Sequence, residues 1–413
     1  MRAKTTPKQL LKYVDAEIEP HIFYLFEFEQ NVRNAALRYI QNNQSGDKTK
    51  GDFSLLFYLS KKIICMKKIV KQVLGVDVAK KELVVCLGRM FDDFTNELYA
   101  HKTFANTVKG FLALLLWVKK NSEETVSIRF VMEATGVYHE SFAYCLDSKG
   151  YDLSIVLPNK ISNYFKTLDV KTITDKTASE AIVLFGLERK LDNWNRPKPI
   201  YKKMRQLTRE RDQIVQERTM VKNMQHAEKA EAEPNKSTLL RLKQRIVFLN
   251  KQEKAIKDEI EVLIKNDEEA SRNVALISTI PGVGVLTAAT VLAETNGFEL
   301  IRNKRQLSSF AGFDVREKQS GTSVKGKPRI SKRGNKYLRK CMHFPALAAI
   351  RHDEKRKSIF VRLVSKHGIK MKAAVAIQRQ LLEMTYTIFK TQTPYDKTYS
   401  SKLNEESAQM AMI

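Results

Sequence analysis

The chain has no long apolar run. Its longest uninterrupted apolar stretch extends from Phe111 to Val118, far short of the roughly 20 residues that a membrane-spanning helix needs. No basic stretch followed by an apolar stretch and a cleavage site opens the chain, so we expect no secretion. These absences predict a cytoplasmic protein without a membrane partner.

Thiols and imidazoles are too scattered to form a recognisable metal motif. The seven histidines form no HxH or HxxxH pair, and the four cysteines form no CxxC pair. This spacing argues against a structural zinc site and fits reduced cytosolic thiols. The cysteines are Cys65, Cys86, Cys145 and Cys341.

Positive charge is the strongest signal of the composition. The 413 residues include 72 Lys and Arg against 46 Asp and Glu, a formal net charge of +26. Such an excess indicates a polyanionic partner, either nucleic acid or an anionic membrane surface, and we favour nucleic acid. The hydrophobic content of 43% is that of a globular protein, and the length suffices for roughly two or three domains.

Composition and periodicity divide the chain into five segments. The first 65 residues lack regular organisation, and we hypothesise that they are an appended segment and that Met66 is the natural start. The predicted segments are an appendage (1–65), an α/β domain (66–195), a helical hairpin (196–270), a mostly helical domain (271–390) and a polar, loose tail (391–413).

Short β-rich segments alternate with helical ones in the α/β domain. Three strands come first, then helices and strands alternate, a pattern that predicts a mixed α/β sheet. The expected strands are 72–79, 82–90, 97–104, 126–133 and 151–157, and the expected helices are 108–120 and 139–149.

The helical hairpin shows apolar residues at helical spacing on both sides of a break at Glu233-Pro234-Asn235. It is predicted as a long antiparallel pair of helices or a coiled coil. Packing on its own protein and joining protomers remain equally open. The spaced residues are Leu207, Ile214 and Val221 before the break, and Leu242, Ile246, Leu249, Ile256, Ile260 and Leu263 after it.

Three carboxylates occupy unusual places in the α/β domain. Asp77 lies within a buried strand, Glu133 ends another strand, and Asp175 begins a helix. A carboxylate in an apolar strand is costly unless a cation compensates it. Acids at the ends of neighbouring strands can converge, and hard oxygen ligands suit Mg²⁺, which commonly acts on phosphates. Singly, each acid is better read as structural; together they favour a catalytic metal site.

The segments "GVDVAKKEL", "MEATGVYH" and "TDKTASEAI" resemble the three acidic motifs of the insertion sequence 110 family of transposases, also called Piv-like or DEDD transposases. The resemblance implies a RuvC-like domain of RNase H type with four acids. Three carry over onto Asp77, Glu133 and Asp175, and the fourth position holds Ala178. Because a methyl group cannot bind a metal, we expect nucleic-acid binding with poor cleavage.

A strongly basic segment runs from Lys318 to Lys340, with nine Lys and Arg and no acid. It is predicted to neutralise DNA phosphates, the alternative being a solvated basic loop. The expected contacts are Lys318, Lys325, Lys327, Arg329, Lys332, Arg333, Lys336 and Arg339.

Two further segments also resemble motifs of the same family. "QSG…GKPRISKRGNKYLR" resembles the C-terminal transposase motif whose serine attacks DNA, a role that passes to Ser320, with Ser323 and Ser331 as competitors. "LISTIPGVGVLTAATVLAE" resembles a helix-hairpin-helix whose glycines, Gly282 and Gly284, expose backbone N–H groups to phosphates. A plain helical packing unit is the alternative for the second motif.

The resemblance covers roughly 71–390 and implies a bacterial, nucleoid-associated enzyme that excises and inserts a mobile element. Its partners would be donor DNA, target DNA, a structured guide RNA and further copies of itself, as a dimer or tetramer. Two alternatives remain: a metal-dependent nuclease resembling Holliday-junction resolvases, in which water attacks, and a catalytically dead transposase remnant that only binds nucleic acid.

Overall fold

The computed structural model describes residues 67–396 except 135, 169, 171, 173, 300, 318, 321–323 and 327. The predicted appendage at 1–65 and most of the predicted tail therefore lie outside the described residues. The chain divides into two compact units, the first ending at Arg196 and the second beginning at Pro197.

A five-stranded mixed sheet forms the centre of the first unit, in the order β3-β2-β1-β4-β5. Strands β1, β2 and β3 are antiparallel neighbours, whereas β4 runs parallel to β1 and β5 parallel to β4. The prediction of a mixed α/β sheet is thus confirmed. The strands are β1 (Ile69–Val78), β2 (Glu82–Phe91), β3 (Asn96–Ala105), β4 (Ile128–Glu133) and β5 (Asp152–Val156).

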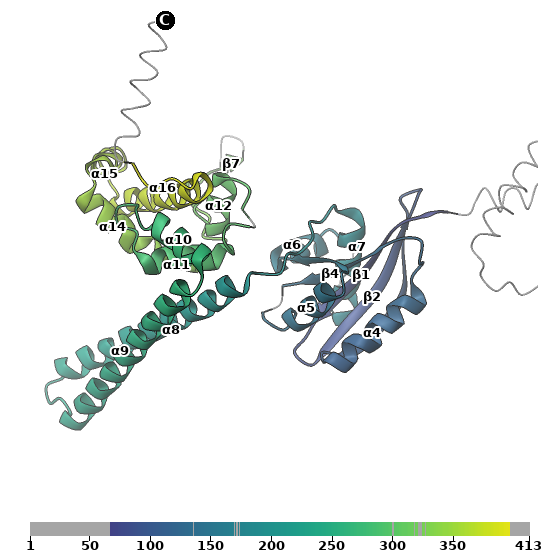
Figure 1. Ribbon diagram of the computed structural model, residues 1–413, viewed down its shortest axis with the longest axis horizontal. Helices are drawn as coiled ribbons and strands as arrows, with labels where there is room; N and C mark the ends of the chain where they lie inside the picture. Colours follow the sequence, from purple (N-terminus) through teal and green to yellow (C-terminus); the bar gives the residue numbers. More distant parts are fainter. Residues whose placement is uncertain are drawn as a thin grey trace, which may run out of the picture. The chain divides into compact units, whose positions relative to one another are not determined.

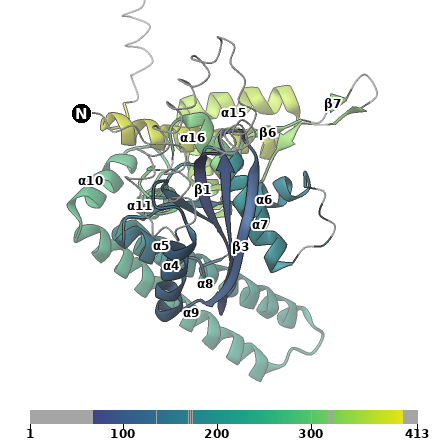
Figure 2. The same ribbon diagram turned by 90° about the vertical axis from the view of Figure 1, so that its right-hand side faces the viewer.

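Helices cover both faces of this sheet. Helices α4 (Val108–Asn121) and α5 (Glu140–Ser148) pack on one face, and α6 (Pro158–Phe165) and α7 (Asp175–Glu188) lie on the other (Figures 1 and 2). Side chains alternate between the faces of a strand. Accordingly Val76 of β1 joins the core cluster of α4 and α5, whereas Val73 joins that of α6 and α7.

Helix α7 approaches β1 at two glycines. A Cβ on Gly75 would lie 2.6 Å from the carbonyl oxygen of Ser179, and one on Gly186 would lie 2.8 Å from Cγ1 of Val73. The earlier residue of β1, Val73, thus meets the later residue of α7, Gly186, and the later residue, Gly75, meets the earlier one, Ser179. The helix runs opposite to the strand, and its first residue lies at the carboxyl end of β1.

Lys71 of β1 holds the far end of α7. Its Nζ donates hydrogen bonds of 2.6 and 2.8 Å to the carbonyl oxygens of Gly186 and Leu187, and one of 2.9 Å to that of Arg189. The last carbonyls of a helix lack intrahelical partners, and a cation there also favours the helix dipole. One lysine thus fixes the helix along the strand.

The second unit is mostly helical, as predicted. Its helices are α8 (Pro199–Ala230), α9 (Lys236–Lys265), α10 (Glu268–Ile277), α11 (Val285–Thr295), α12 (Lys304–Ala311), α13 (Lys336–Cys341), α14 (His343–His352), α15 (Glu354–His367) and α16 (Lys370–Thr391). Two short strand pairs interrupt them, β6 (Val315–Arg316) with β9 (Arg329–Ile330) and β7 (Gln319–Ser320) with β8 (Val324–Lys325).

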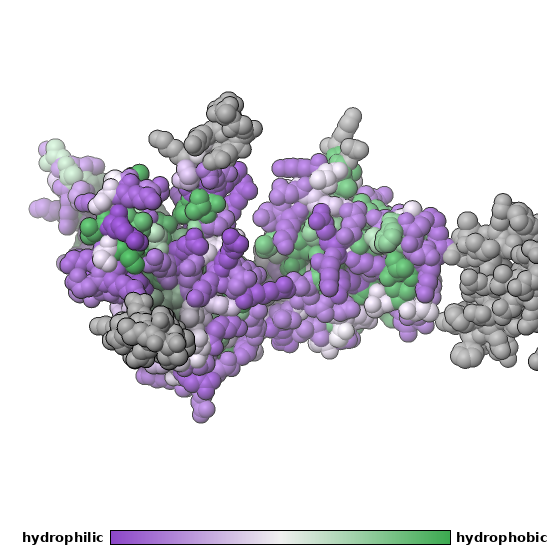
Figure 3. Space-filling view, turned by 90° about the horizontal axis from the view of Figure 1, so that it is seen from above, coloured by the Kyte–Doolittle hydropathy of each residue, from purple (hydrophilic) through white to green (hydrophobic). Residues whose placement is uncertain are grey.

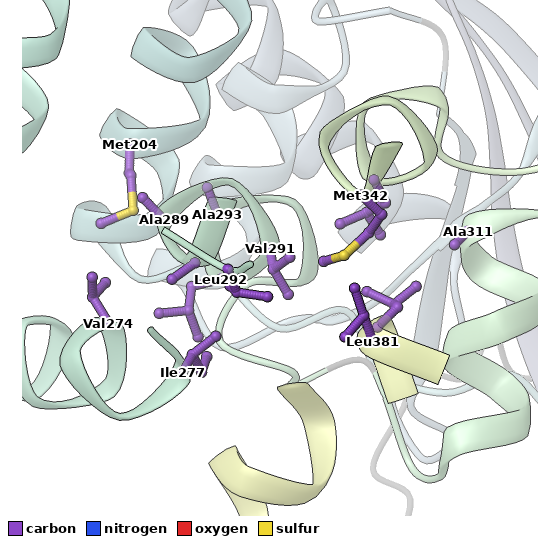
Figure 4. Close-up of a cluster of buried hydrophobic side chains, with 14 of the residues drawn as sticks. Met204, Val274, Ile277, Ala289, Val291, Leu292, Ala293, Ala311, Met342 and Leu381 are labelled. Carbon is purple, nitrogen blue, oxygen red and sulfur yellow. The ribbon is translucent and has the colours of Figure 1, made fainter. Parts of the chain in front are cut away.

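Helix α11 is the centre of this unit. It is apolar on almost every side, which is typical of a fully buried helix. Figure 4 shows Val291 and Leu292 of α11 among side chains from neighbouring helices, such as Ile277 of α10 and Leu381 of α16. Helix α11 therefore lies at the centre of the core that α8, α10 and α13 share.

Helices α8 and α9 lie side by side and run in opposite directions (Figure 1). Asn235 begins α9 as its N-cap, with its Oδ1 accepting hydrogen bonds from two backbone N–H groups. The predicted apolar positions face the partner helix, and those buried include Leu207, Ile214, Val221, Leu242, Leu249 and Ile256.

Hydrophilic residues cover much of the surface in view, with smaller hydrophobic areas between them (Figure 3). Within the described part of the chain, no helix combines the length and apolar character that crossing a membrane requires.

Candidate active site

Asp77 and Glu133 lie at the same level on neighbouring strands. Val76 of β1 pairs with Met132 of β4 in the parallel ladder, so the next residues in register are Asp77 and Glu133. The side chains of Val73 on β1 and Val131 on β4 pack toward α7. Asp77 is four residues beyond Val73 on its strand, and Glu133 is two residues beyond Val131. Because side chains alternate, both acids lie on the α7 face of the sheet.

Asp175 reaches the same edge from the helix. It is the first residue of α7, and Thr174 caps the helix. The Thr174 hydroxyl accepts a 3.2 Å hydrogen bond from the Thr177 backbone N–H, and the Thr177 hydroxyl accepts one of 2.8 Å from the Thr174 N–H. This capping box fixes where the helix begins. Since α7 runs opposite to β1, its exposed first carboxylate lies beside the end of that strand.

Electrostatic coupling shows that the three acids share one environment. Burial raises the pKa of Asp77, the charge of Asp175 raises it further, and a hydrogen bond from the Val78 backbone opposes both. Burial and the charge of Asp77 likewise raise the pKa of Glu133. The charge of Asp175 thus acts on Asp77 and the charge of Asp77 acts on Glu133, as expected for carboxylates at the same edge of the sheet.

The donor set fits a divalent cation. Among the described residues, no three His, Cys, Asp or Glu side chains already stand close enough to enclose an ion. The chemistry nevertheless suits a hard cation, because all three groups are carboxylates and their mutual repulsion would be relieved by a bound positive charge. Asp77, Glu133 and Asp175 are thus the candidate ligands of the sheet edge.

No other acid of α7 replaces the missing fourth one. Ala178 is only partly buried, and its methyl group offers no ligand. Oε1 of Glu180 lies 2.9 Å from Nε2 of His101 on β3, away from the three acids. Ser179 is buried, and its hydroxyl donates a 2.7 Å hydrogen bond to the carbonyl oxygen of Lys176. The departure at position 178 is therefore uncompensated within this helix.

Ser320 belongs to the second unit, on the short β7–β8 pair, where it pairs with Val324. Of its two competitors, Ser323 lies outside the described residues. The Ser331 hydroxyl donates a 2.6 Å hydrogen bond to Oδ1 of Asp314. That bond engages the Ser331 proton in a local turn.

Most of the described basic side chains around Ser320 are exposed. Lys318 and Lys327 lie outside the described residues. Arg339 differs from the rest, because its Nη1 donates to the carbonyl oxygens of Ala311 at 2.7 Å and Gly334 at 3.2 Å and so ties the end of α12 to the loop before α13. The exposed members are Arg329, Lys332, Arg333 and Lys336.

The two glycines between α10 and α11 differ in their surroundings. Gly282 has a φ of +87°, and a Cβ there would lie 2.5 Å from the Pro345 carbonyl oxygen, so packing against α14 alone requires glycine. Gly284 is the N-cap of α11, and a Cβ there would meet nothing within 4 Å. Only Gly284 therefore presents an open helix N-terminus.

Comparisons with known proteins match both units. The model of the transposase IS116/IS110/IS902 family matches residues 274–360, and the model of the DEDD transposases of IS110 elements matches residues 74–227. The chain is 27% identical to the pilin gene-inverting protein of Moraxella lacunata over 332 residues, which are 79% of this chain and 98% of that one.

A second relative and one solved structure are similar over shorter regions. The transposase for insertion sequence element IS1111A of Coxiella burnetii is 31% identical over 144 residues, which are 33% of this chain and 37% of that one. T. thermophilus RuvC in complex with a Holliday junction substrate aligns with a TM-score of 0.24 and 9% identity, covering 30% of this chain and 99% of that one.

Proposed function

The chain belongs to the IS110 family of transposases and is a DNA recombinase, and we propose that it exchanges DNA strands through a phosphoserine formed on Ser320. The observation that carries the proposal is the edge of the sheet where Asp77, Glu133 and Asp175 share one electrostatic environment. In this proposal the first unit is RuvC-like, and its acids hold Mg²⁺.

The three carboxylates would hold that cation at the edge of the sheet, beside the reacting phosphate. A bound Mg²⁺ would supply Lewis acidity and offset the charge that develops on the phosphate oxygens. Asp77 and Glu133 stand one residue beyond Val76 and Met132, the last pair of the parallel ladder between β1 and β4, so the sheet brings both acids to the same edge. Asp175, which is exposed at the first residue of α7, would be the third carboxylate ligand. Preset ligands reduce the reorganisation needed when substrate binds.

Ser320 supplies the nucleophile. Its Oγ would attack phosphorus and lose its proton, while the bond from phosphorus to a deoxyribose oxygen breaks and that oxygen takes up a proton. The phosphoserine conserves the phosphodiester energy, so attack by another deoxyribose hydroxyl can rejoin DNA without an external energy source. The basic residues around β7 and β8 favour this step, because positive charge stabilises both the alkoxide and the pentavalent transition state.

Donor DNA, target DNA and a structured guide RNA are the proposed partners. The net charge of +26 supports several polyanionic partners, while RNA guidance rests on the family resemblance alone. The chain would act as a dimer or tetramer, with the α8–α9 hairpin acting as a coiled coil between protomers. Association with the bacterial nucleoid in the cytoplasm follows from DNA binding.

The test is a search for the covalent intermediate. Full-length protein is incubated with nicked or junction DNA and Mg²⁺ or Mn²⁺, then separated on a denaturing gel. We expect a protein–DNA adduct that disappears in Ser320→Ala and in Asp77→Asn and persists in Ser331→Ala, the matched control. An adduct that persists in Ser320→Ala rules out the proposed nucleophile.

Ala178 favours a second candidate, a remnant that binds nucleic acid without cutting it. This candidate predicts DNA binding without any cleavage by the unchanged chain, even when Mg²⁺ or Mn²⁺ is supplied. Cleavage without any adduct, retained in Ser320→Ala, would instead indicate a nuclease in which water attacks.

A further inference from the structure

One asparagine joins the segments that follow two of the acids. Asn106 lies between β3 and α4, and its Nδ2 donates hydrogen bonds of 3.0 Å to the carbonyl oxygen of Ala79 and 3.1 Å to that of Tyr138. Its backbone N–H donates a further bond of 2.8 Å to the carbonyl oxygen of Lys81. Three segments distant in sequence therefore meet at this side chain.

These segments continue directly from the acid-bearing strands. Ala79 is two residues beyond Asp77, and Tyr138 is five residues beyond Glu133. The parallel ladder between β1 and β4 ends at the pair Val76–Met132, one residue before the acids. Beyond that pair, the Asn106 side chain connects the turn after β1 with the loop after β4 through its two hydrogen bonds.

We propose that Asn106 is a positioning residue that fixes the separation of Asp77 and Glu133 by tying together the segments beyond them. The inference rests on the proposed function, because it assigns Asn106 to the same cation-binding edge. Asn106 itself touches neither acid in this role; it acts through the backbone of Ala79 and Tyr138.

The side chain chemistry explains why asparagine is suited to this place. A carboxamide NH₂ carries two hydrogens, so one nitrogen can satisfy two carbonyl oxygens at once. Aspartate has the same size but no donor when ionised, and it would place negative charge against both carbonyls. Alanine would leave both carbonyls without this partner. Asn106→Ala and Asn106→Asp therefore remove the tie in two different ways.

Binding of Mn²⁺ to the full-length protein, measured by calorimetry, tests the inference without relying on cleavage. Residues that orient metal ligands typically contribute about 10- to 100-fold to metal affinity, so Asn106→Ala should weaken Mn²⁺ binding by about 10-fold. Hydrogen exchange should rise at residues 79–81 and 136–139 and remain unchanged elsewhere. Asn106→Asp should show the same two effects, and its matched size allows the test if Asn106→Ala does not fold.

Asn121→Ala is the matched control. Asn121 lies at the opposite end of α4, where its Nδ2 donates one 2.7 Å hydrogen bond to the Trp117 carbonyl oxygen. Its removal should leave Mn²⁺ affinity unchanged. If Asn121→Ala and Asn106→Ala lower the Mn²⁺ affinity equally, the decrease reflects general destabilisation of the protein, and the inference is overturned.

Asp77→Asn separates this inference from the proposed function. If Asp77→Asn loses Mn²⁺ binding while both Asn106 variants keep it, the metal site stands and the role of Asn106 is refuted. If Asp77→Asn binds Mn²⁺ like the unchanged chain, the proposed metal site is wrong and the inference falls with it.

Discussion

Asp77 shows at the scale of one residue how the proposed activity conflicts with stability. Burial and the charge of Asp175 raise its pKa in the folded chain. The unfolded chain therefore releases this proton at a lower pH than the folded chain does. Stability must fall as pH rises from the ordinary carboxyl range through the raised pKa, and it stays reduced at neutral pH. Glu133, whose pKa is also raised, adds to the same decrease in stability.

Asp77→Asn should consequently stabilise the metal-free protein while abolishing adduct formation. Near pH 7 we expect the melting temperature to rise by on the order of 2–4 °C, the shift that about 1 kcal/mol produces in a unit of this size. Near pH 3, where the wild-type carboxyl is already protonated, the difference should vanish. Scanning calorimetry at both pH values provides the measurement, and a lower melting temperature at pH 7 would contradict this reading of the site.

Restoring an acid at position 178 is the corresponding gain-of-function change. Ala178→Asp adds a fourth carboxylate at the position of the family's last acid, so Mg²⁺-dependent cleavage should rise by about 10-fold or more, since even outer partners of ligands contribute this much. Without a cation, the added negative charge should lower the melting temperature. Ala178→Asn has nearly the same size and no charge, and it should gain far less activity; equal rates for the two variants would count against a metal role.

At the scale of elements, the position of α7 decides whether the site exists. The helix must lie close to β1 for Asp175 to reach the edge, and Gly75 permits that approach. Lys71 sets the position of the helix along the strand by binding its terminal carbonyls. A change at either residue should be felt at the site, although neither lies there.

Gly75→Ala tests this placement. The new methyl group would meet backbone atoms of Ser179 and Val183 at 2.6 and 2.7 Å, so α7 must move. We expect a destabilisation of about 1–3 kcal/mol, as for other overpacked sites, together with weaker Mn²⁺ binding. Gly150→Ala serves as control: its φ of +72° makes alanine cost about 1 kcal/mol, but open space surrounds it. Denaturant unfolding and calorimetry should show weakened metal binding only in Gly75→Ala.

The α8–α9 hairpin contains a buried acid that joins its two helices. Oε1 of Glu253 lies 2.7 Å from Nη2 of Arg211, its Oε2 contacts Arg218, and Lys257 lies 3.2 Å away on the same helix. Burial alone would raise the pKa of Glu253, but the hydrogen bonds from Lys257 and Arg218 and the charge of Arg211 together lower it. This stabilisation is present above the ordinary carboxyl pKa and is lost as pH falls through the lowered value.

Glu253→Gln should therefore destabilise the second unit near neutral pH by about 1–3 kcal/mol, because partly buried cations lose their counter-charge. The difference from wild type should shrink below about pH 4, the ordinary range of carboxyl ionisation. Glu354→Gln is the control, since the Glu354 side chain is 89% exposed beside Lys357 and should change stability by less than about 0.5 kcal/mol. Urea unfolding at pH 7 and at about pH 3, below the ordinary carboxyl range, provides the measurement, and an equal destabilisation at both pH values would contradict the prediction.

At the scale of the whole molecule, positive charge governs association with nucleic acid. DNA binding with a net charge of +26 should weaken steeply with salt, because each neutralised phosphate releases condensed counterions. Charge on the basic segment should matter more than equal charge elsewhere if that segment binds DNA directly.

Replacing Arg329, Lys332, Arg333 and Lys336 with glutamine tests this point. The slope of log affinity against log salt should become shallower by about 0.9 for each phosphate that the variant no longer neutralises. An equal reduction of charge on the hairpin, through glutamine at Lys229, Lys243, Lys251 and Lys254, should leave the slope nearly unchanged. Binding titrations at several salt concentrations would reject the assignment if both sets changed the slope equally.

Local patterns predicted much of the fold and the identity of the candidate acids. The strands around Asp77 and Glu133 were predictable because buried apolar runs and alternation are properties of a few consecutive residues. The short strand pairs around Ser320 were not predicted, since each strand has two residues and leaves no periodic pattern. Lys71 and Asn106 were missed for a different reason, because each acts through backbone carbonyls that have no side-chain signature.

The amino-acid sequence by itself determined which carboxylates could serve the site, where helix α7 begins, and that the fourth acid is absent at position 178. The tertiary structure alone decided the direction of α7 against β1 and the tie that Asn106 makes to Tyr138, 32 residues away. The physical reason is range. Capping, alternation and apolar periodicity depend on near neighbours, whereas contacts between distant segments depend on how the sheet packs against its helices.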